Sequence, residues 1–186
     1  DFLKEINATE SYVLKGDVVV VGGGNVAIDC SRDGRRVGAH VTQVSLETRD
    51  IMPASEEEVE EALEDGVKMF FGWGPKEILK NENNEVTGIV FKKCLSVKDE
   101  SGRFNPQYDE DDTMTIPCGH VVLAVGQSIV WGDLLKGENV ELDRRGCVVA
   151  NKETYQTSQP DIFAGGDVYT GPKFAIDAIA AGKEGA

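Results

Sequence analysis

The sequence predicts an α/β fold built around a parallel sheet, and three observations predict it. Residues 17–21 are a short run of β-branched side chains after an aspartate, typical of a parallel strand that is buried on both faces. Three glycines follow at once, at positions 22–24. Small residues then recur at helical spacings up to Gly38, and residues 40–46 predict a second strand. One strand–helix–strand unit is therefore complete by residue 46.

A second helix and a third strand continue this pattern. Ser55 is a favourable N-cap, and Glu58, three residues later, completes a capping box. The helix is predicted to end at Gly66, and residues 67–71 predict the third strand. The acidic run at residues 56–61 could be a binding patch or a solvated first turn, and the helix dipole favours the second interpretation.

The chain beyond residue 85 is expected to form a β-meander, then a last strand and a last helix. Short strands are predicted at residues 86–95, 113–117 and 120–125. The polar stretch 98–112 predicts a solvated hairpin tip. An apolar strand at residues 162–164 and a helical pattern at residues 174–185 complete the predicted layout.

Composition and charge exclude several classes of function. The 186 residues carry 33 acidic and 19 basic side chains, a formal net charge of −14, so no cationic surface for nucleic acid or an anionic membrane is expected. No apolar run approaches the roughly 20 residues that span a bilayer. We therefore expect a cytoplasmic protein with neither nucleic-acid nor membrane partners. The chain begins at an aspartate rather than a methionine, which indicates a piece of a longer protein.

The cysteines do not form a metal or redox motif. They are spread widely, and no two have the C-x-x-C spacing that iron–sulfur, zinc and dithiol sites use. We expect them to be small buried hydrophobic side chains, and no metal site is predicted. They are Cys30, Cys94, Cys118 and Cys147.

The strongest chemical signal is a G-x-G-x-x-A motif between the first strand and the first helix. Its first glycine permits a tight turn, its second lets a pyrophosphate approach the backbone, and the small third residue lets the helix pack against the strand. Because the motif has the strand–turn–helix context that it requires, it predicts a dinucleotide-binding loop. The alternatives are a glycine turn without a ligand and a site for S-adenosylmethionine. The candidate loop residues are Gly22, Gly23, Gly24, Asn25, Val26 and Ala27.

Two charged residues after the second strand bear on which dinucleotide binds. Glu47 follows Ala27 by 20 residues, where an acidic side chain accepts hydrogen bonds from the adenine ribose and repels a 2′-phosphate. It is either that ligand or an ordinary loop glutamate. Arg49 is the opposing signal, because an arginine can pair with the 2′-phosphate of NADP. We therefore expect NAD, with NADP as the alternative.

Two later segments extend the interpretation beyond one nucleotide. Residues 121–126 and 161–167 are apolar strands that end in glycine and in Gly-Gly-Asp, respectively. With the helix predicted downstream they resemble the flavoproteins that carry two dinucleotide-binding domains. Within that superfamily the chain is similar to the glutamate synthase small (beta) subunit group, which includes electron-bifurcating and pyrimidine-reducing flavoproteins. The matching segments are Gly-Gly-Gly-Asn-Val-Ala-Ile-Asp at 22–29, Met52-Pro53-Ala54 before an acidic helix, Ala124-Val125-Gly126, and Phe-Ala-Gly-Gly-Asp-Val at 163–168.

The resemblance implies a fold with two domains. Residues 1–118 would be a Rossmann-like nicotinamide-dinucleotide domain with a β-meander and an N-terminal linker. Residues 119–186 would be the C-terminal part of an FAD-binding domain, so that the chain is a truncated two-dinucleotide-binding flavoprotein fold. The resemblance also implies that Asp167 holds a flavin ribityl hydroxyl, with Gly126 and Gly166 as further cofactor-binding residues.

The chain departs from the family pattern in two places. The family's pair of arginines after the second strand, which suits NADPH, is replaced by Leu46 and Glu47. The family's first glycine motif, which binds the ADP half of FAD, has no counterpart before Asp17. We therefore expect FAD to bind the full-length parent and not this fragment alone.

The expected function is that of a fragment of an FAD-dependent oxidoreductase that passes hydride between NAD(P)H and flavin. The resemblance implies that electrons continue to iron–sulfur clusters in another domain or in a partner subunit. Because the cofactors carry the redox chemistry, no catalytic acid or base is assigned to this chain. The alternatives are a non-catalytic NAD-binding module and a disulfide-reductase-like flavoprotein, for which the chain lacks a cysteine pair.

Overall fold

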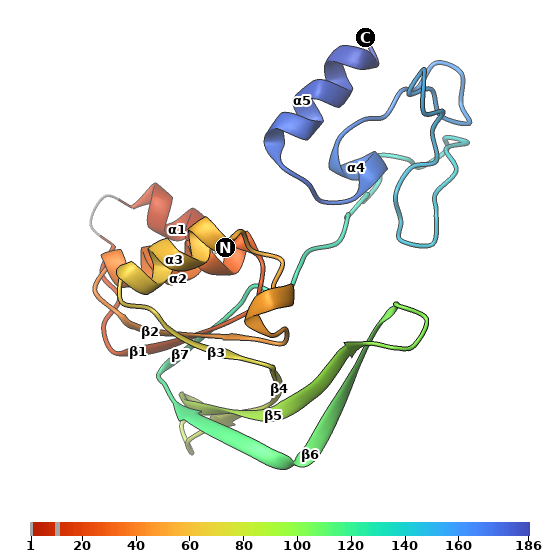
Figure 1. Cartoon of the computed structure of the whole chain (residues 1–186). Helices are drawn as coiled ribbons and strands as arrows, with labels where there is room; N and C mark the ends of the chain where they lie inside the picture. The colour runs from red at the N-terminus through yellow and green to blue at the C-terminus, as the bar shows by residue number, and fades with distance from the viewer. Residues whose placement is uncertain (1, 10–11) are drawn as a thin grey trace. The chain divides into compact units, whose positions relative to one another are not determined.

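The computed structural model describes residues 2–9 and 12–186, and it divides the chain into two compact units, Asp1–Gly126 and Gln127–Ala186. Figure 1 shows the course of the chain through both units. The predicted boundary between residues 118 and 119 falls earlier in the chain than this division. The difference arises because one more strand belongs to the first unit.

A four-stranded parallel sheet forms the centre of the first unit. Its strands lie in the order β3, β2, β1, β7, and each neighbouring pair is parallel. They are β1 (Asp17–Val21), β2 (His40–Ser45), β3 (Lys68–Phe71) and β7 (His120–Leu123). The α/β fold and its first three predicted strands are confirmed.

The valines of β1 face two different hydrophobic cores, because side chains alternate along a strand. Val18 and Val20 lie in the core beneath the helices, whereas Val19 and Val21 lie in a second core on the opposite face. None of these valines is more than 3% exposed. Burying a valine side chain is worth roughly 1.5–3 kcal/mol, so this strand needs an apolar residue at each of these positions.

Helices α2 (Asn25–Arg36) and α3 (Glu56–Glu64) form at the two predicted places and lie on one face of the sheet (Figure 1). The predicted N-cap of α3 is confirmed, since the N–H of Glu58 donates to Oγ of Ser55 at 3.3 Å. The N–H of Ser55 donates instead to Oδ1 of Asn25, so the reciprocal half of the predicted capping box is not formed. The start of α3 is thereby tied to the start of α2.

The first residues form a helix where a linker is predicted. In α1 (Phe2–Ala8), the side chains of Phe2 and Leu3 pack against the helix-side core. A short 3-10 helix, η1 (Arg49–Ile51), follows β2. Within residues 2–9 and 12–186, every helix is too short or too polar to cross a membrane.

An antiparallel sheet covers the other face of the parallel sheet (Figure 1). Its order is β4 (Trp73–Lys80), β5 (Val86–Lys98) and β6 (Phe104–Pro117). Ile89 and Phe91 of β5 are fully buried and pack with Val19, Val21 and Val44. The first unit is therefore a three-layer structure of helices, parallel sheet and antiparallel sheet.

The hairpin of this second sheet is longer than the sequence predicts. The predicted hairpin tip at residues 98–112 is confirmed only in part, because the turn takes up residues 99–103 between β5 and β6, and residues 104–112 belong to β6. β6 is an edge strand with mostly exposed side chains, so charged residues cost little there and discourage pairing with another chain. The polar stretch therefore includes part of an edge strand as well as the turn. The sequence also did not predict β4.

β7 lies in the parallel sheet, and its predicted place in the meander is wrong. It pairs with β1 from Val18 opposite His120 to Val21 opposite Leu123. The N–H of Ala124 continues the ladder by donating to the carbonyl oxygen of Val21 at 2.8 Å. This pairing holds the segment after residue 118 in the first unit.

The second unit has little regular structure. It contains α4 (Asp167–Thr170) and α5 (Ala175–Glu184), and α5 confirms the predicted last helix. The predicted strand at residues 162–164 is wrong, because Phe163 forms only an isolated bridge with Gln156 and no ladder continues it.

A cluster of ion pairs centred on Arg32 joins α2 to the end of α3. The guanidinium of Arg32 donates to Oδ2 of Asp65 at 2.8 Å and also to Glu61, and Glu58 lies 3.6 Å away. The hydrogen bond from Arg32 holds the pKa of Asp65 below its ordinary range. The cluster therefore stabilises the packing of the two helices while Asp65 is ionised.

Replacing Arg32 by Ala should lower the urea midpoint modestly at neutral pH, because the carboxylates are partly exposed. A carboxyl whose pKa is lowered by folding contributes stability above its unfolded pKa and loses it as the pH falls through the lowered value. The difference between wild type and Arg32→Ala should therefore shrink below about pH 4. Arg36→Ala is the control, since Arg36 is more exposed and lies 3.6 Å from Asp65. A difference independent of pH would contradict this account.

Candidate functional site

The glycine loop at residues 22–24 lies between β1 and α2, at the carboxyl ends of the parallel strands. The N–H of Gly22 donates to the carbonyl oxygen of Val44 at 2.9 Å, which keeps the loop against β2. A Cβ at Gly22 would lie 2.3 Å from the carbonyl oxygen of Ala124, and the residue has a φ of +149°. Glycine is required here by the close approach of the chain after β7.

The carbonyl groups of all three glycines are held by donors within the protein. The oxygen of Gly22 accepts from Nε2 of Gln43 at 3.1 Å, and the oxygen of Gly23 accepts from the N–H of Ala54 at 2.9 Å. The oxygen of Gly24 accepts from the N–H of Ala27 at 2.9 Å in the first turn of α2. The negative ends of these peptide groups therefore face the protein.

The N–H groups that follow are free. Among the described residues, no hydrogen bond uses the backbone N–H of Gly24, Asn25 or Val26. These are the unpaired donors that every helix has in its first turn, at the positive end of the helix dipole. A Cβ at Gly24 would have no atom within 4 Å, so the space beside these donors is open. The loop can therefore bind an anionic group through its backbone.

The side chain of Asn25 is occupied by a structural contact. Its Oδ1 accepts from the N–H of Ser55 at 3.1 Å, next to the Ala54 N–H that holds Gly23. The segment Met52-Pro53-Ala54 thus supports the loop from the side. Asn25 can offer a ligand its backbone N–H, while its amide group fixes the neighbouring segment.

Glu47 lies directly against the loop. A Cβ at Gly23 would be 2.5 Å from Oε2 of Glu47. The backbone of Glu47 is held by two hydrogen bonds to its carbonyl oxygen, which accepts from Oγ of Ser45 at 2.8 Å and from the N–H of Gly72 at 2.9 Å. The structure therefore brings this carboxylate to the glycine loop, as the spacing in the sequence suggests.

Arg49 is engaged elsewhere. Its guanidinium pairs with Oε1 of Glu56 at 2.5 Å and with Glu60, both on α3. The hydrogen bonds that Arg49 donates to Glu56 and Glu60 hold the pKa of Arg49 above its ordinary range. Two carboxylates thus already pair with this arginine and would compete with a 2′-phosphate for it, whereas the carboxylate of Glu47 lies against the loop.

A comparison with protein families decides the class of the chain. The family described as pyridine nucleotide-disulphide oxidoreductase matches residues 2–182. The chain belongs to that family. The predicted resemblance to the glutamate synthase small subunit group is also confirmed by the relatives below.

Two relatives match nearly all of this family member and are much longer than it is. It is 36% identical over 193 residues to the NADP(+)-dependent formate dehydrogenase subunit beta of Moorella thermoacetica, covering 100% of this chain and 26% of the relative. It is 36% identical over 177 residues to the glutamate synthase [NADPH] small chain of Escherichia coli, covering 91% of this chain and 37% of the relative. The chain thus spans well under half the length of either.

Solved structures agree on the fold. The thioredoxin reductase of T. acidophilum superposes with a TM-score of 0.70 at 24% identity, covering 91% of this chain and 50% of that chain. At this identity the match is evidence for the fold alone. Together with the family match, it confirms the two-dinucleotide-binding flavoprotein fold that the sequence predicts.

The other candidate residues of this oxidoreductase-family chain lie at the end of the first unit and in the second unit. Gly126 ends the first unit with a φ of +106° and open space around it. Gly166 and Asp167 belong to the second unit, where a Cβ at Gly166 would lie 3.0 Å from the Cβ of Ala178. The exposed carboxylate of Asp167 accepts from the N–H of Lys173 at 3.2 Å. Gly126 thus lies in the first unit, and Gly166 and Asp167 lie in the second.

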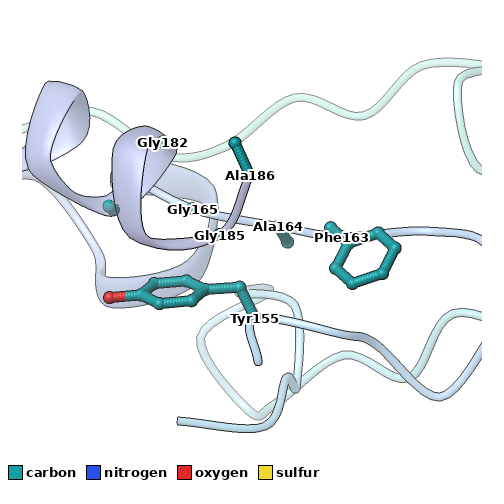
Figure 2. A pocket seen from close by; sticks show the side chains of 8 residues that line it. Tyr155, Phe163, Ala164, Gly165, Gly182, Gly185 and Ala186 are labelled. Carbon is teal, nitrogen blue, oxygen red and sulfur yellow. The ribbon is translucent and has the colours of Figure 1, made fainter. Parts of the chain in front are cut away.

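A small pocket of about 180 Å³ also lies in the second unit (Figure 2). Its lining is mainly apolar, and the hydroxyl of Tyr155 donates to Oε2 of Glu184 at 2.6 Å. The pocket therefore offers a ligand little polar recognition. Its lining residues are Tyr155, Phe163, Ala164, Gly165, Ala181, Gly182, Gly185 and Ala186.

The cysteines of this family member do not form a redox pair in the described part of the chain. All of them are buried and free of disulfides. Burial raises the pKa of the Cys30 thiol to about 11, and burial also raises the pKa of Cys94 and Cys118. Such thiols are protonated at neutral pH, and the thiolate is the reactive form. Among the described residues, no group of three His, Cys, Asp or Glu side chains could hold a metal ion.

The sequence analysis did not identify the buried polar side chains of α2 and β2 that support the glycine loop. Ser31, Gln43 and Ser45 are each at most 1% exposed. A glutamine within an otherwise apolar parallel strand is the signal that could have revealed them, because a buried amide requires partners.

Proposed function

We propose that the chain is the nicotinamide-nucleotide-binding part of an FAD-dependent oxidoreductase. The observation that carries this proposal is the glycine loop, whose carbonyl groups accept hydrogen bonds from the protein, while in the described part of the chain no hydrogen bond uses the N–H groups of Gly24, Asn25 and Val26. The space beside Gly24 is open. That arrangement fits the pyrophosphate of a dinucleotide. The family membership supports the same class of ligand.

Each loop residue has a specific part in this proposal. Gly22 and Gly23 give the close turn against β7 and Glu47, and Gly24 leaves room for the pyrophosphate. Ala27, fully buried, lets α2 pack against the sheet. The Glu47 carboxylate would accept hydrogen bonds from the adenine ribose hydroxyls. This chain's residues thus bind and orient the nucleotide.

The second unit would contribute to the flavin side of the longer protein. Asp167 would hold a ribityl hydroxyl, with Gly166 and Gly126 lining the same cofactor, as the family resemblance implies. Flavin, when bound, supplies hydride exchange with the nicotinamide and passes electrons onward, to iron–sulfur clusters or a partner subunit. The residues of this chain need no acid or base for that step.

NADH should bind more tightly than NADPH, because the Glu47 carboxylate would repel a 2′-phosphate. Calorimetric titration of the chain should show a preference of roughly tenfold or more, since a charged hydrogen bond is worth roughly 1.5–3 kcal/mol. Replacing Glu47 by Arg should erode that preference. This expectation sets the chain apart from relatives whose names specify NADP(+) or NADPH.

Glu64→Arg is the matched control, because it makes the same change of charge at the exposed end of α3. Its ratio of NADH to NADPH affinity should equal that of the wild type. Equal or tighter binding of NADPH by the wild type would overturn the assignment to Glu47 and point to Arg49.

Two other functions are separable by experiment. A module that binds NAD without turnover would give a full-length protein with no flavin spectrum, whereas the proposed oxidoreductase would be yellow. A disulfide reductase would need a reactive cysteine pair, and the cysteines of this chain are buried with raised thiol pKa values at Cys30, Cys94 and Cys118. The flavin spectrum and a dithiol titration of the full-length protein distinguish the three.

A further inference from the structure

Gln43 is a buried amide at the base of the glycine loop. It lies in β2, and only 1% of its surface is exposed. Burying an amide without hydrogen-bond partners is costly, so the partners of this side chain show what it does. Both polar atoms of the amide are paired, one with the Gly22 carbonyl oxygen and the other with the Ser31 hydroxyl.

The orientation of the amide is determined by chemistry. The carbonyl oxygen of Gly22 can only accept, so the atom that faces it at 3.1 Å must be Nε2. Oε1 then faces Oγ of Ser31 at 2.8 Å. The Ser31 hydroxyl also lies 2.8 Å from the carbonyl oxygen of Ala27, so its single proton is shared between two acceptors. Ser31 thereby connects α2 to the amide.

Gln43 completes the fixation of Gly22 by β2. The N–H of Gly22 is held by the carbonyl oxygen of Val44, and its carbonyl group is held by the side chain of Gln43. Without that second bond the carbonyl group would lose the donor that keeps it turned inward. A glycine peptide rotates easily, and a carbonyl oxygen turned toward the ligand would repel a pyrophosphate.

We infer that Gln43 is a positioning residue for the pyrophosphate, with Ser31 as the group that orients its amide. The side chain does not touch the nucleotide; it keeps the Gly22 carbonyl turned inward so that the free N–H groups of the loop can act. This inference rests on the proposed function of the loop as a dinucleotide site.

Gln43→Met removes the donor while keeping the length of the side chain. NADH and NADPH should both bind at least about tenfold more weakly, and by the same factor, because the pyrophosphate is common to both. Val41→Ala is the control, since Val41 is 3% exposed in the same strand and lies outside the binding loop. It should lose stability without losing affinity. If Val41→Ala weakens binding as much as Gln43→Met at matched loss of stability, the positioning role is wrong.

Gln43→Glu provides a readout that a purely structural role would not produce. A protonated carboxyl can donate to Gly22 and accept from Ser31, as the amide does, whereas an ionised one cannot donate. Burial raises the pKa of a carboxyl, so the affinity of this variant for NAD+ should recover by about tenfold as the pH is lowered from about 8 to about 6. The affinity of Gln43→Met should stay constant across that range. A folded Glu variant whose affinity does not rise toward acid pH would contradict the inference.

Ser31→Ala decides the question if the Gln43 variants do not fold. It leaves the amide in place but removes its orienting hydroxyl, and affinity for NADH should fall about threefold. Unchanged affinity in a folded Ser31→Ala chain, or affinity within twofold in a folded Gln43→Met chain, would overturn the inference while leaving the proposed function intact. A folded wild-type chain that binds neither nucleotide would instead overturn the proposed function itself.

Discussion

The Gly24→Val chain should fold but should bind neither NADH nor NADPH measurably. The backbone of Gly24 has a φ of −94°, which any residue adopts, and a Cβ there would meet no atom within 4 Å. That open space lies beside the free N–H groups of Gly24, Asn25 and Val26. A valine side chain would fill the space that the pyrophosphate needs.

Gly119→Val is the matched control for this variant. Gly119 also has no atom within 4 Å of a Cβ position, and it precedes β7 at the amino end of that strand. Calorimetric titration should give this control the affinity of the wild type. An unchanged dissociation constant in folded Gly24→Val would remove the site from residues 22–27.

The isolated chain should purify without colour and should not oxidise NADH faster than free flavin does. In the resembled family, FAD is held at its pyrophosphate by a glycine loop that precedes the nicotinamide domain, and the only G-x-G-x-x-A motif in these 186 residues is at 22–27. Each missing charge-assisted hydrogen bond is worth roughly 1.5–3 kcal/mol. Since each 1.4 kcal/mol is about tenfold in affinity, the loss should amount to many orders of magnitude.

The full-length protein should be yellow and should lose flavin when Asp167 is changed to Ala. Asp177→Ala is the comparison, because Asp177 accepts from the N–H of Phe174 at the start of α5 and is not assigned to flavin. Absorbance spectra of the purified proteins measure the flavin content of both variants. Stoichiometric flavin in the isolated chain would show that the FAD site is misplaced in this interpretation.

Local patterns predicted the parts of the fold that depend on neighbouring residues. The β-branched run of β1, the glycine turn after it and the N-cap at Ser55 are confirmed, because strand preference, turn geometry and capping bonds involve residues close together in the chain. The same holds for the placing of Glu47 after the second strand, which spacing alone indicates.

Tertiary structure decided which segments meet. The sequence did not reveal that β7 pairs with β1, that the polar residues 104–112 belong to the edge strand β6, or that Arg49 pairs with Glu56 and Glu60 of α3. Polarity predicts exposure, and exposure is shared by loops and edge strands alike. Only the folded arrangement distinguishes them.

The candidate site shows the same division. Its motif is contiguous, so the sequence by itself predicted the glycine turn at residues 22–27 between a buried strand and a helix, which the structure has. The Ala124 carbonyl that requires glycine at position 22, and the Gln43 amide that holds the Gly22 carbonyl, come from other strands. Their partners were decided by the tertiary structure, because a hydrogen bond depends on which groups the sheet brings within about 3 Å of each other, whatever their separation in the chain.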